Sequence, residues 1–183
     1  MTVIKKNYNK IVITYLVFII VFALDQVTKQ SVINNMPIDI FVDTQKYTSY
    51  PAQEIFSWLW INHVVNFGAA WSLLYGQKAL LLTFALVVFI GIIYYEFTSR
   101  QTRTKTLSAA LGFILAGMGN AVDRLRLGYV TDFLEFRNSA GQNVFPIFNV
   151  ADISIDIGIV LLLIYVLFQE GKNKPAIDEP IIN

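Results

Sequence analysis

The sequence ISIDIGIVLLLIYVLF occupies residues 153–168 and has the composition of a membrane-spanning helix. Three similar apolar stretches precede it, at residues 11–24, 79–95 and 107–122. With its flanks, each stretch approaches the roughly 20 residues that a helix needs to cross the hydrocarbon layer. We therefore predict an all-α integral membrane protein with four transmembrane helices, at about residues 11–31, 79–97, 106–126 and 152–169.

The composition of the chain excludes several classes of protein. Of its 183 residues, 55% are hydrophobic and 15% are charged, against roughly half and a quarter in soluble domains. A net charge of +1 offers no basic surface for nucleic acid, so we expect no such partner. Cysteine is absent, which excludes thiol nucleophiles and disulfides. Because His63 is the one histidine, a multi-histidine metal site cannot form, and we expect neither a metal nor a cofactor.

The basic residues predict the orientation in the membrane, because positive charge resists translocation. They lie before the first span, between the second and third spans, and after the fourth, at Lys5, Lys6, Lys10, Arg100, Arg103, Lys105, Lys172 and Lys174. We therefore place both termini in the cytoplasm and residues 34–78 and 127–151 in two outer loops. Residues 1–170 are expected to form one domain, and the polar tail 171–183 is predicted to be disordered.

The first outer loop is too long for a simple turn, and it predicts a small extracytoplasmic β-containing region. Residues 38–42 and 56–65 have the composition of short strands, and residues 44–54 between them predict a polar loop. Most of the nearby aromatic residues are interpreted as an interfacial belt between lipid and water, namely Phe56, Trp58, Trp60 and Phe67. Trp71 is set apart from this belt. An alternative hypothesis makes Trp58, Trp60 and the loop a ledge over a site.

Polar residues within the first and third spans require an explanation, because charge is costly in lipid. Asp25 and Lys29 are four residues apart on one helical face, where they can form an ion pair or belong to a site. In the third span, Asn120 lies deeper and needs a partner, whereas Asp123 and Arg124 can also mark the headgroup boundary. The small residues of this span predict close helix packing, namely Ala109, Ala110, Gly112, Ala116, Gly117 and Gly119.

Asp132 and Asp152 are predicted to lie at a similar depth on the outer side. Two convergent carboxylates, one ionised and one protonated, can activate water and protonate a departing amine. Simpler interpretations remain, since Asp132 can be a solvated loop acid and Asn149 with Asp152 can cap the fourth helix. If they form a pair, we expect Asp152 to be the ionised member, because it lies in the first turn of a helix.

Five segments occur together in the order found in one family. They are Asp25–Lys29 (DQVTK), Asn66–Ser72 (NFGAAWS), Gly119–Arg124 (GNAVDR), Val130–Phe133 (VTDF) and Phe148–Asp152 (FNVAD). In these segments and in the four spans around them, the chain resembles the bacterial type II lipoprotein signal peptidases over nearly its whole length.

This resemblance implies an aspartic endopeptidase of the bacterial cytoplasmic (inner) membrane, with its active site on the extracytoplasmic side. Family members remove the signal peptide from diacylglyceryl-modified prolipoproteins by cutting before the lipidated cysteine, and they are inhibited by the cyclic peptide globomycin. The expected partners are therefore this substrate, membrane lipids and globomycin-type inhibitors. The resemblance implies that Asp132 and Asp152 are catalytic. It implies that the supporting residues are Asp25, Lys29, Asn66, Gly68, Asn120, Arg124 and Asn149.

Asp156 is less expected, because similar sequences usually carry a neutral residue there. It follows Asp152 by one helical turn on the same face, and we expect it to be buried and uncharged unless Lys29 or Arg124 pairs with it. An accessory electrostatic role is a hypothesis.

Three rival functions remain at this point. They are an ion-coupled carrier, a noncatalytic membrane assembly factor, and a protease that uses Lys29 with Ser31 or Ser72.

Overall fold

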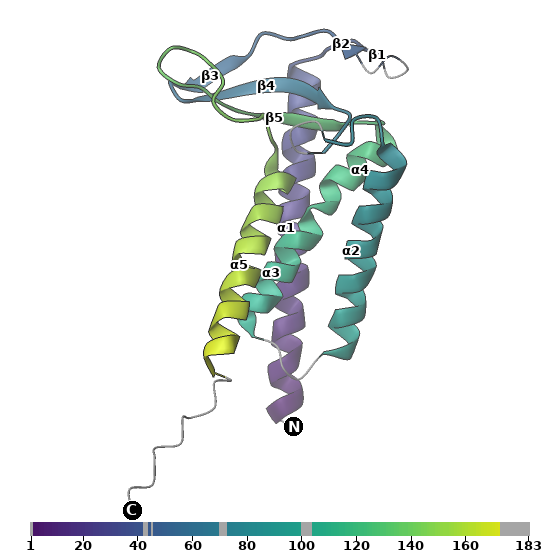
Figure 1. The fold of residues 1–183 in the computed structure, drawn as a ribbon, viewed down its shortest axis with the longest axis vertical. Helices are drawn as coiled ribbons and strands as arrows, with labels where there is room; N and C mark the ends of the chain where they lie inside the picture. The colour runs from purple at the N-terminus through teal and green to yellow at the C-terminus, as the bar shows by residue number, and fades with distance from the viewer. Residues whose placement is uncertain (1, 42–43, 45, 70–72, 100–103, 173–183) are drawn as a thin grey trace, which may run out of the picture.

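The computed structural model describes residues 2–41, 44, 46–69, 73–99 and 104–172 of the chain. The helices and strands follow in the order α1 (Thr2–Asn35), β1 (Ile40–Phe41), β2 (Lys46–Tyr47), β3 (Gln53–Phe56), β4 (Leu59–Asn66), α2 (Lys78–Thr98), α3 (Lys105–Ala116), α4 (Met118–Arg126), β5 (Val130–Phe136) and α5 (Val150–Lys172). Figure 1 shows the helices along the long axis and the strands across one end. Trp71, Ser72, the basic residues Arg100 and Arg103, and the tail 173–183 lie outside the described residues.

Four helical segments in the described part of the chain are long and apolar enough to cross a membrane. They are Asn9–Asn35, Lys78–Thr98, Lys105–Arg126 and Val150–Phe168. The third segment comprises α3 and α4 in succession. Together with the strands, these segments give the chain the architecture of a multi-pass membrane protein with a small sheet region.

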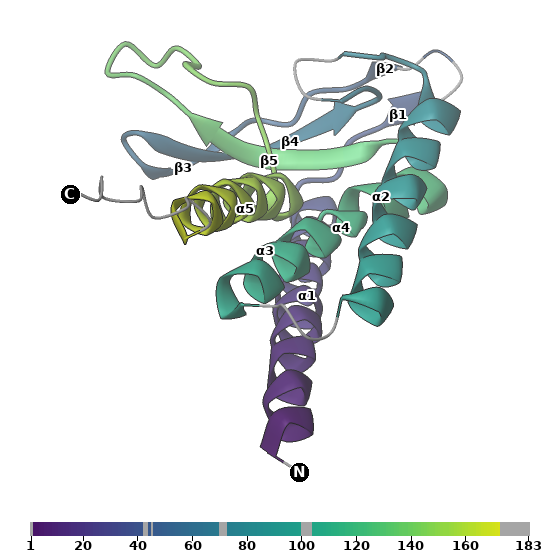
Figure 2. The same ribbon diagram turned by 60° about the horizontal axis from the view of Figure 1, so that its bottom comes forward.

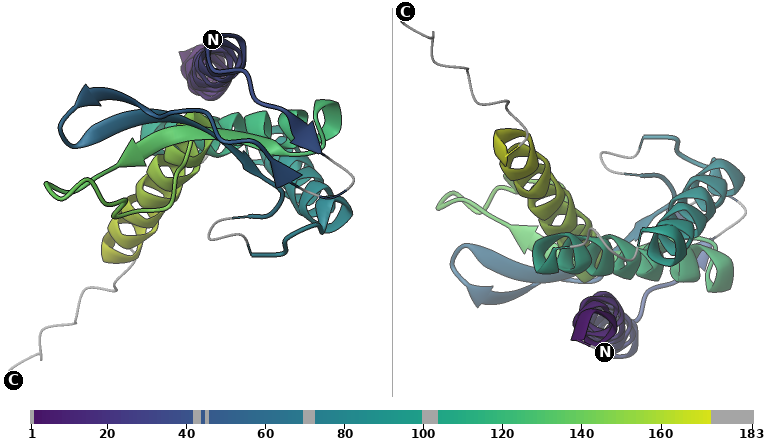
Figure 3. Two further views of the ribbon diagram at one scale, coloured as in Figure 1. Left: turned by 90° about the horizontal axis from the view of Figure 1, so that it is seen from above. Right: turned by 90° about the horizontal axis from the view of Figure 1, so that it is seen from below.

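The third segment lies at the centre of the bundle. Within its most apolar window 61% of the residues are buried, against 11%, 11% and 17% in the other three. Figure 3 shows α1 on one side of α3 and α4, and α2 and α5 on the other. Large apolar side chains of the outer helices are therefore exposed, as with Phe84 (70%) and Leu167 (68%). Such extensive apolar exposure is typical of a surface that contacts lipid.

Glycines allow the central helix to approach its neighbours closely. A Cβ atom on Gly112 would lie 2.5 Å from the Thr14 carbonyl oxygen of α1, and one on Gly158 of α5 would lie 3.0 Å from the Ala110 carbonyl oxygen. The predicted packing role of Gly112 is therefore confirmed. The third span is not one regular helix, however, because α3 ends at Ala116 and α4 begins at Met118. Gly117 forms this break, and Ile155 of α5 fills the space beside it.

The strands form two antiparallel sheets, β1–β2 and β3–β4–β5. The two predicted strands are present in shortened form as β1 and β4, but residues 44–54 are not simply a loop, because they include β2 and the start of β3. β5 was not predicted as a strand. Its pairing with β4 is long-range, with Val64 opposite Asp132 and Asn66 opposite Val130, and local sequence carries little information about such a partner.

The three-stranded sheet packs directly on the end of α1. Val32 of α1 and Met36, which directly follows that helix, form an apolar cluster with Phe133 of β5. Figure 2 shows the segment after β5 looping out and returning to the start of α5. This arrangement places the sheet across the ends of α1, α4 and α5, where the polar residues of the three helices gather.

Candidate active site

A reciprocal cap between Asn149 and Asp152 holds the start of α5. The Asp152 backbone N–H donates to Asn149 Oδ1 at 3.0 Å, and the Asn149 N–H donates to Asp152 Oδ2 at 3.1 Å. The cap predicted from the sequence is therefore present, and it satisfies backbone donors that a helix N-terminus otherwise leaves free. It also fixes the Asp152 carboxylate at the sheet end of the helix.

The residue before this cap pairs with β5 and brings a second carboxylate to the same place. The Leu134 N–H donates to the Phe148 carbonyl at 2.8 Å, and the Phe148 N–H donates to the Leu134 carbonyl at 3.2 Å. This pairing sets Asn149 beside Asp132, and Asn149 Nδ2 donates to Asp132 Oδ1 at 2.6 Å. Asp132 and Asp152 therefore both hydrogen-bond to one asparagine.

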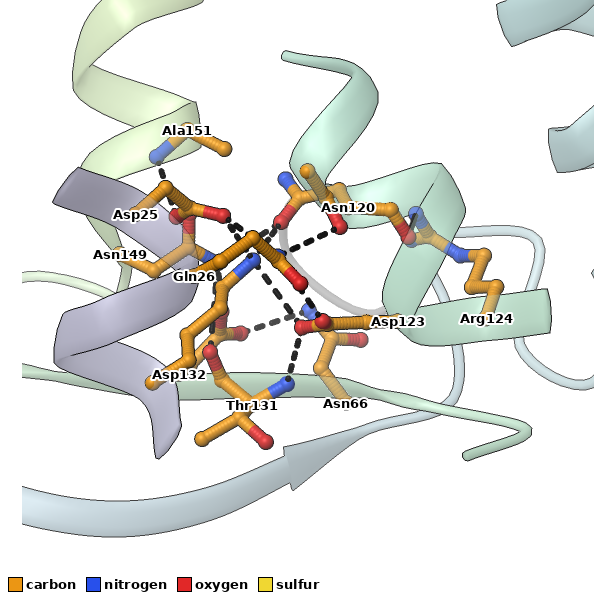
Figure 4. A network of polar contacts seen from close by, with 12 residues as sticks. Asp25, Gln26, Asn66, Asn120, Asp123, Arg124, Thr131, Asp132, Asn149 and Ala151 are labelled. Atoms are coloured by element: carbon orange, nitrogen blue, oxygen red, sulfur yellow. Dashed lines mark hydrogen bonds and ion pairs between the residues drawn. The ribbon is translucent and has the colours of Figure 1, made fainter. Parts of the chain in front are cut away.

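Two further asparagines hold the remaining carboxylate oxygens. Asn120 of α4 donates to Asp152 Oδ1 at 2.7 Å, and Asn66 of β4 donates to Asp132 Oδ2 at 2.9 Å. Asn149 Nδ2 also donates to Asn120 Oδ1 at 3.1 Å. Figure 4 shows Asn120, Asn149 and Asp132 turned toward one another. Every oxygen of the two carboxylates accepts a hydrogen bond, so their orientations are fixed.

A buried cation lies behind this pair. Lys29 is 2% exposed, and its Nζ lies 2.9 Å from Asp25 Oδ2 and 3.0 Å from Asp123 Oδ2. Lys29 Nζ also donates to Asn120 Oδ1 at 2.7 Å. Because an ammonium group has three N–H donors, these contacts use all of them. The ion pair of Asp25 and Lys29 proposed from their spacing is present, and it is part of a larger cluster.

Asp25 joins α1 to both neighbouring helices at the level of the site. Its Oδ1 accepts the Ala151 backbone N–H of α5 at 2.8 Å. Gln26 Nε2 donates to Asp25 Oδ2 at 3.1 Å and to Asp123 Oδ1 at 3.2 Å. A Cβ atom on Gly119 would lie 2.1 Å from Asp25 Oδ2, so the close approach of the Asp25 carboxylate to α4 requires glycine at position 119.

The loop that follows β4 is held by Arg124 of α4. The guanidinium donates through Nη2 to the Gly68 carbonyl and through Nη1 to the Asn120 carbonyl, the latter at 3.2 Å. The Gly68 N–H donates to Asn66 Oδ1 at 2.8 Å. Arg124 therefore positions Asp132 indirectly. It holds Gly68, Gly68 holds the side chain of Asn66, and Asn66 donates to the Asp132 carboxylate.

Burial gives Asp132 the properties of an acid that is protonated near neutral pH. Its exposed fraction is 2%, and burial together with the negative charge of Asp152 raises the pKa of Asp132 to about 7. Hydrogen bonds from Asn66 and Asn149, and the charge of Lys29, act in the opposite direction. Two neighbouring carboxyl groups that share one proton can serve as an acid and a base. Among the described residues, no group of three or more acids and histidines is placed to hold a metal ion.

Comparisons with known proteins show which family the chain belongs to. The family model described as signal peptidase (SPase) II matches residues 17–168. The chain belongs to the signal peptidase II family. Its relatives include a lipoprotein signal peptidase of Listeria monocytogenes strain EGD-e, which is 39% identical over 161 residues, covering 87% of this chain and 96% of the relative. Another, from Halothermothrix orenii, is 35% identical over 157 residues, with 85% and 96% coverage.

Two solved structures resemble this chain in fold. Both are described as bacterial membrane enzymes, with TM-scores of 0.72 and 0.66 and sequence identities of 30% and 32%. The first match covers 91% of this chain and 94% of the other, and the second covers 84% and 92%. The chain is thus a membrane protease of the lipoprotein-processing family over most of its length.

The structure brings all of the predicted site residues of the chain into one hydrogen-bonded network. They are Asp25, Lys29, Asn66, Gly68, Asn120, Arg124, Asp132, Asn149 and Asp152. Sequence reasoning missed two members. Asp123, which the sequence left as a marker of the headgroup boundary, is 2% exposed and paired with Lys29. Gln26 was not considered, although its position beside Asp25 in the DQVTK segment was a signal.

Two further expectations were wrong. Phe67 is not part of an interfacial belt, because it is 5% exposed and packs edge-on against Tyr75 and Tyr129. Asp156 is exposed rather than buried, and it pairs with neither Lys29 nor Arg124. The serine–lysine alternative lacks its base, because Lys29 is fully engaged with acceptors. The other serine of that alternative, Ser72, lies outside the described residues.

Trp58 is exposed, which both the interfacial belt and the ledge over a site require.

Proposed function

We propose that the chain is an aspartic endopeptidase that cleaves diacylglyceryl-modified prolipoproteins immediately before the lipidated cysteine. Asp132 and Asp152 form the catalytic pair in this proposal. The observation that carries it is the shared contact with Asn149, which holds a buried and a partly buried carboxyl group from separate elements in one network. The names of the relatives, which are lipoprotein signal peptidases, support the substrate class.

Asp152 acts as the general base in the first step. It lies in the first turn of α5 and accepts the Asn149 N–H, and the positive end of the helix dipole favours its ionised form. Its carboxylate takes a proton from water as the water oxygen attacks the scissile carbonyl carbon. Asp132, whose pKa is raised to about 7, donates its proton to the carbonyl oxygen.

The second step separates the products. The tetrahedral intermediate collapses, and the bond from the carbonyl carbon to the cysteine nitrogen breaks. Asp152 returns its proton to the departing amine, and Asp132 recovers a proton from the gem-diol. The signal peptide leaves with a new carboxyl group, which then loses its proton to water, and the lipoprotein keeps a free N-terminal amine on the lipidated cysteine.

In this proposal, the sheet end of the molecule lies on the extracytoplasmic side of the bacterial inner membrane, and both termini lie in the cytoplasm. Lys105 begins α3 at the end of the bundle opposite the sheet, which agrees with the preference of basic residues for the cytoplasm (Figure 1). A diacylglyceryl group stays in the outer leaflet, so it presents the scissile bond near the headgroups. The site at the start of α5 lies at the corresponding end of the span.

Purified protein in lipid nanodiscs is expected to cut a diacylglyceryl-modified prolipoprotein before its cysteine, and globomycin is expected to inhibit the reaction. Mass spectrometry of both products identifies the cleaved bond. The matched control is the same prolipoprotein without its lipid, which we expect to be cut at least about a hundredfold more slowly, because the lipid holds the bond at the site. Equal cleavage of the two substrates would contradict the proposed specificity.

The pH dependence tests the role of Asp132. We expect kcat/KM to fall as pH rises through about 7, because the proton that Asp132 must donate is lost above its raised pKa. Asn66 stabilises the ionised form of Asp132 by a hydrogen bond, so Asn66→Ala raises this pKa further and moves the falling limb to higher pH. The measurement is the pH–rate profile of both proteins. An unmoved limb in Asn66→Ala would assign the titration to another group.

A further inference from the structure

Asp156 is an acidic side chain on an exposed flank of the fourth span. The flank of α5 that packs against the bundle contains Ala151 and Ser154, which are 0% and 1% exposed, and Gly158. Asp156 is exposed, and it follows Asp152 by four residues, which is about one helical turn and about 6 Å along the axis. The two acids therefore lie on the same side of α5, with Asp156 deeper in the membrane.

No group in the described chain compensates this acid. Asp156 makes no hydrogen bond or ion pair with the described residues, and the two basic residues near the site are occupied. Lys29 contacts Asp25, Asp123 and Asn120, while Arg124 donates to backbone carbonyls. The neighbours of Asp156 along the exposed flank of α5, Ile159 and Leu163, are apolar, and they are 46% and 57% exposed. Polar residues at such positions are costly, so they commonly serve function rather than stability.

In the proposed function, which this step rests on, the substrate passes this flank of α5. The segment before the scissile bond leads into the membrane, past Asp152 toward the depth of Asp156. That segment must be extended where water attacks, so its backbone N–H groups lose their helical acceptors in a medium that offers no others. An extended chain advances about 3.3 Å per residue, so the 6 Å rise reaches about two residues before the cleaved bond.

We propose that Asp156 is a substrate-binding residue that accepts a hydrogen bond from a backbone N–H of the signal peptide, two or three residues before the bond that is cut. The contact pairs a donor exposed by unwinding of the substrate with an acceptor that has no partner in the described chain. It also selects the extended form of the segment, because a helical segment keeps its N–H groups bonded internally.

An ester scan of the substrate tests this contact. Lipidated peptides carry one backbone N–H replaced by an ester oxygen, at each of the five residues before the cut in turn. In the wild-type protein we expect one position, the second or third before the cut, to lower kcat/KM about tenfold, the size of effect expected from losing one hydrogen bond. Asp156→Leu is expected to lower kcat/KM for the all-amide peptide by a similar factor, mainly through KM.

The combination of the two changes distinguishes direct contact from an indirect effect. With Asp156→Leu, the ester at the sensitive position is expected to cause no further loss, whereas additive losses would overturn the proposal. Asp156→Asn is expected to retain most of the affinity, because its amide oxygen still accepts. Glu54→Gln is the matched control, since Glu54 is an exposed acid outside the spans. Undiminished turnover in Asp152→Asn would instead refute the proposed function, and it is measured in the same assay.

Discussion

Asp132→Asn and Asp152→Asn are each expected to lower kcat by about a thousandfold or more, the range lost when general acid–base catalysis is removed. An amide at position 152 cannot accept a proton from water, and an amide at position 132 cannot donate one to the carbonyl oxygen. Because the acids act as a pair, we expect the double variant to lose little more than either single variant. The measurement is single-turnover cleavage of the lipidated substrate.

Folding and binding have to be measured beside this loss. Each substitution introduces an NH2 group opposite side chains that donate to the carboxylates in the wild type, namely Asn66, Asn120 and Asn149. An unsatisfied buried donor costs about 1–3 kcal/mol. We therefore expect a lower Tm but intact binding of globomycin. Asp39→Asn, which changes an exposed acid outside the spans, should leave turnover unchanged. Turnover within tenfold of wild type in either site variant would refute the catalytic pair.

The parts of the fold that sequence could predict are those that depend on local properties. Apolar length indicates the spans, because a chain in lipid must satisfy its backbone polar groups internally and a helix does so without outside partners. The cap of α5 was also predictable, because its two residues, Asn149 and Asp152, are only three positions apart and hydrogen-bond each other. Gly112 was predictable as a packing residue because small side chains let membrane helices approach.

The parts that sequence could not predict depend on long-range partners. β5 forms because it pairs with β4 and with Phe148, and neither partner is evident from the composition of residues 130–136. Asp123 is buried because Lys29 of α1 lies opposite it, which spacing within α4 does not reveal. The rotation of α5 decides that Asp156 is exposed, and the packing of Ala151 and Gly158 sets that rotation. Resemblance predicted the candidate site residues, but only the packed helices show how these residues lie relative to one another.

Lys29→Met is expected to destabilise the protein by about 3–5 kcal/mol, the usual cost of removing one partner of a buried ion pair. Lys29 is 2% exposed, and its ammonium lies between the carboxylates of Asp25 and Asp123. Without it, two buried carboxylates face each other with no counter-charge in contact, and Asn120 loses the donor that fixes its orientation toward Asp152. Thermal unfolding in detergent is expected to show a Tm lower by roughly 10 °C.

The destabilisation has an electrostatic cause that a second set of variants can isolate. Asp25→Asn combined with Asp123→Asn removes both negative charges, so in that background Lys29→Met should cost much less than it does in the wild type. Lys78→Met is the matched control, because Lys78 is exposed at the start of α2 and its loss should leave Tm almost unchanged. If Lys29→Met costs the same in both backgrounds, the attraction between the ammonium and the two carboxylates is not the source of the lost stability. The electrostatic role also predicts that Lys29→Met cleaves more slowly even at low temperature, where it is folded, because Asn120 no longer holds Asp152 in place.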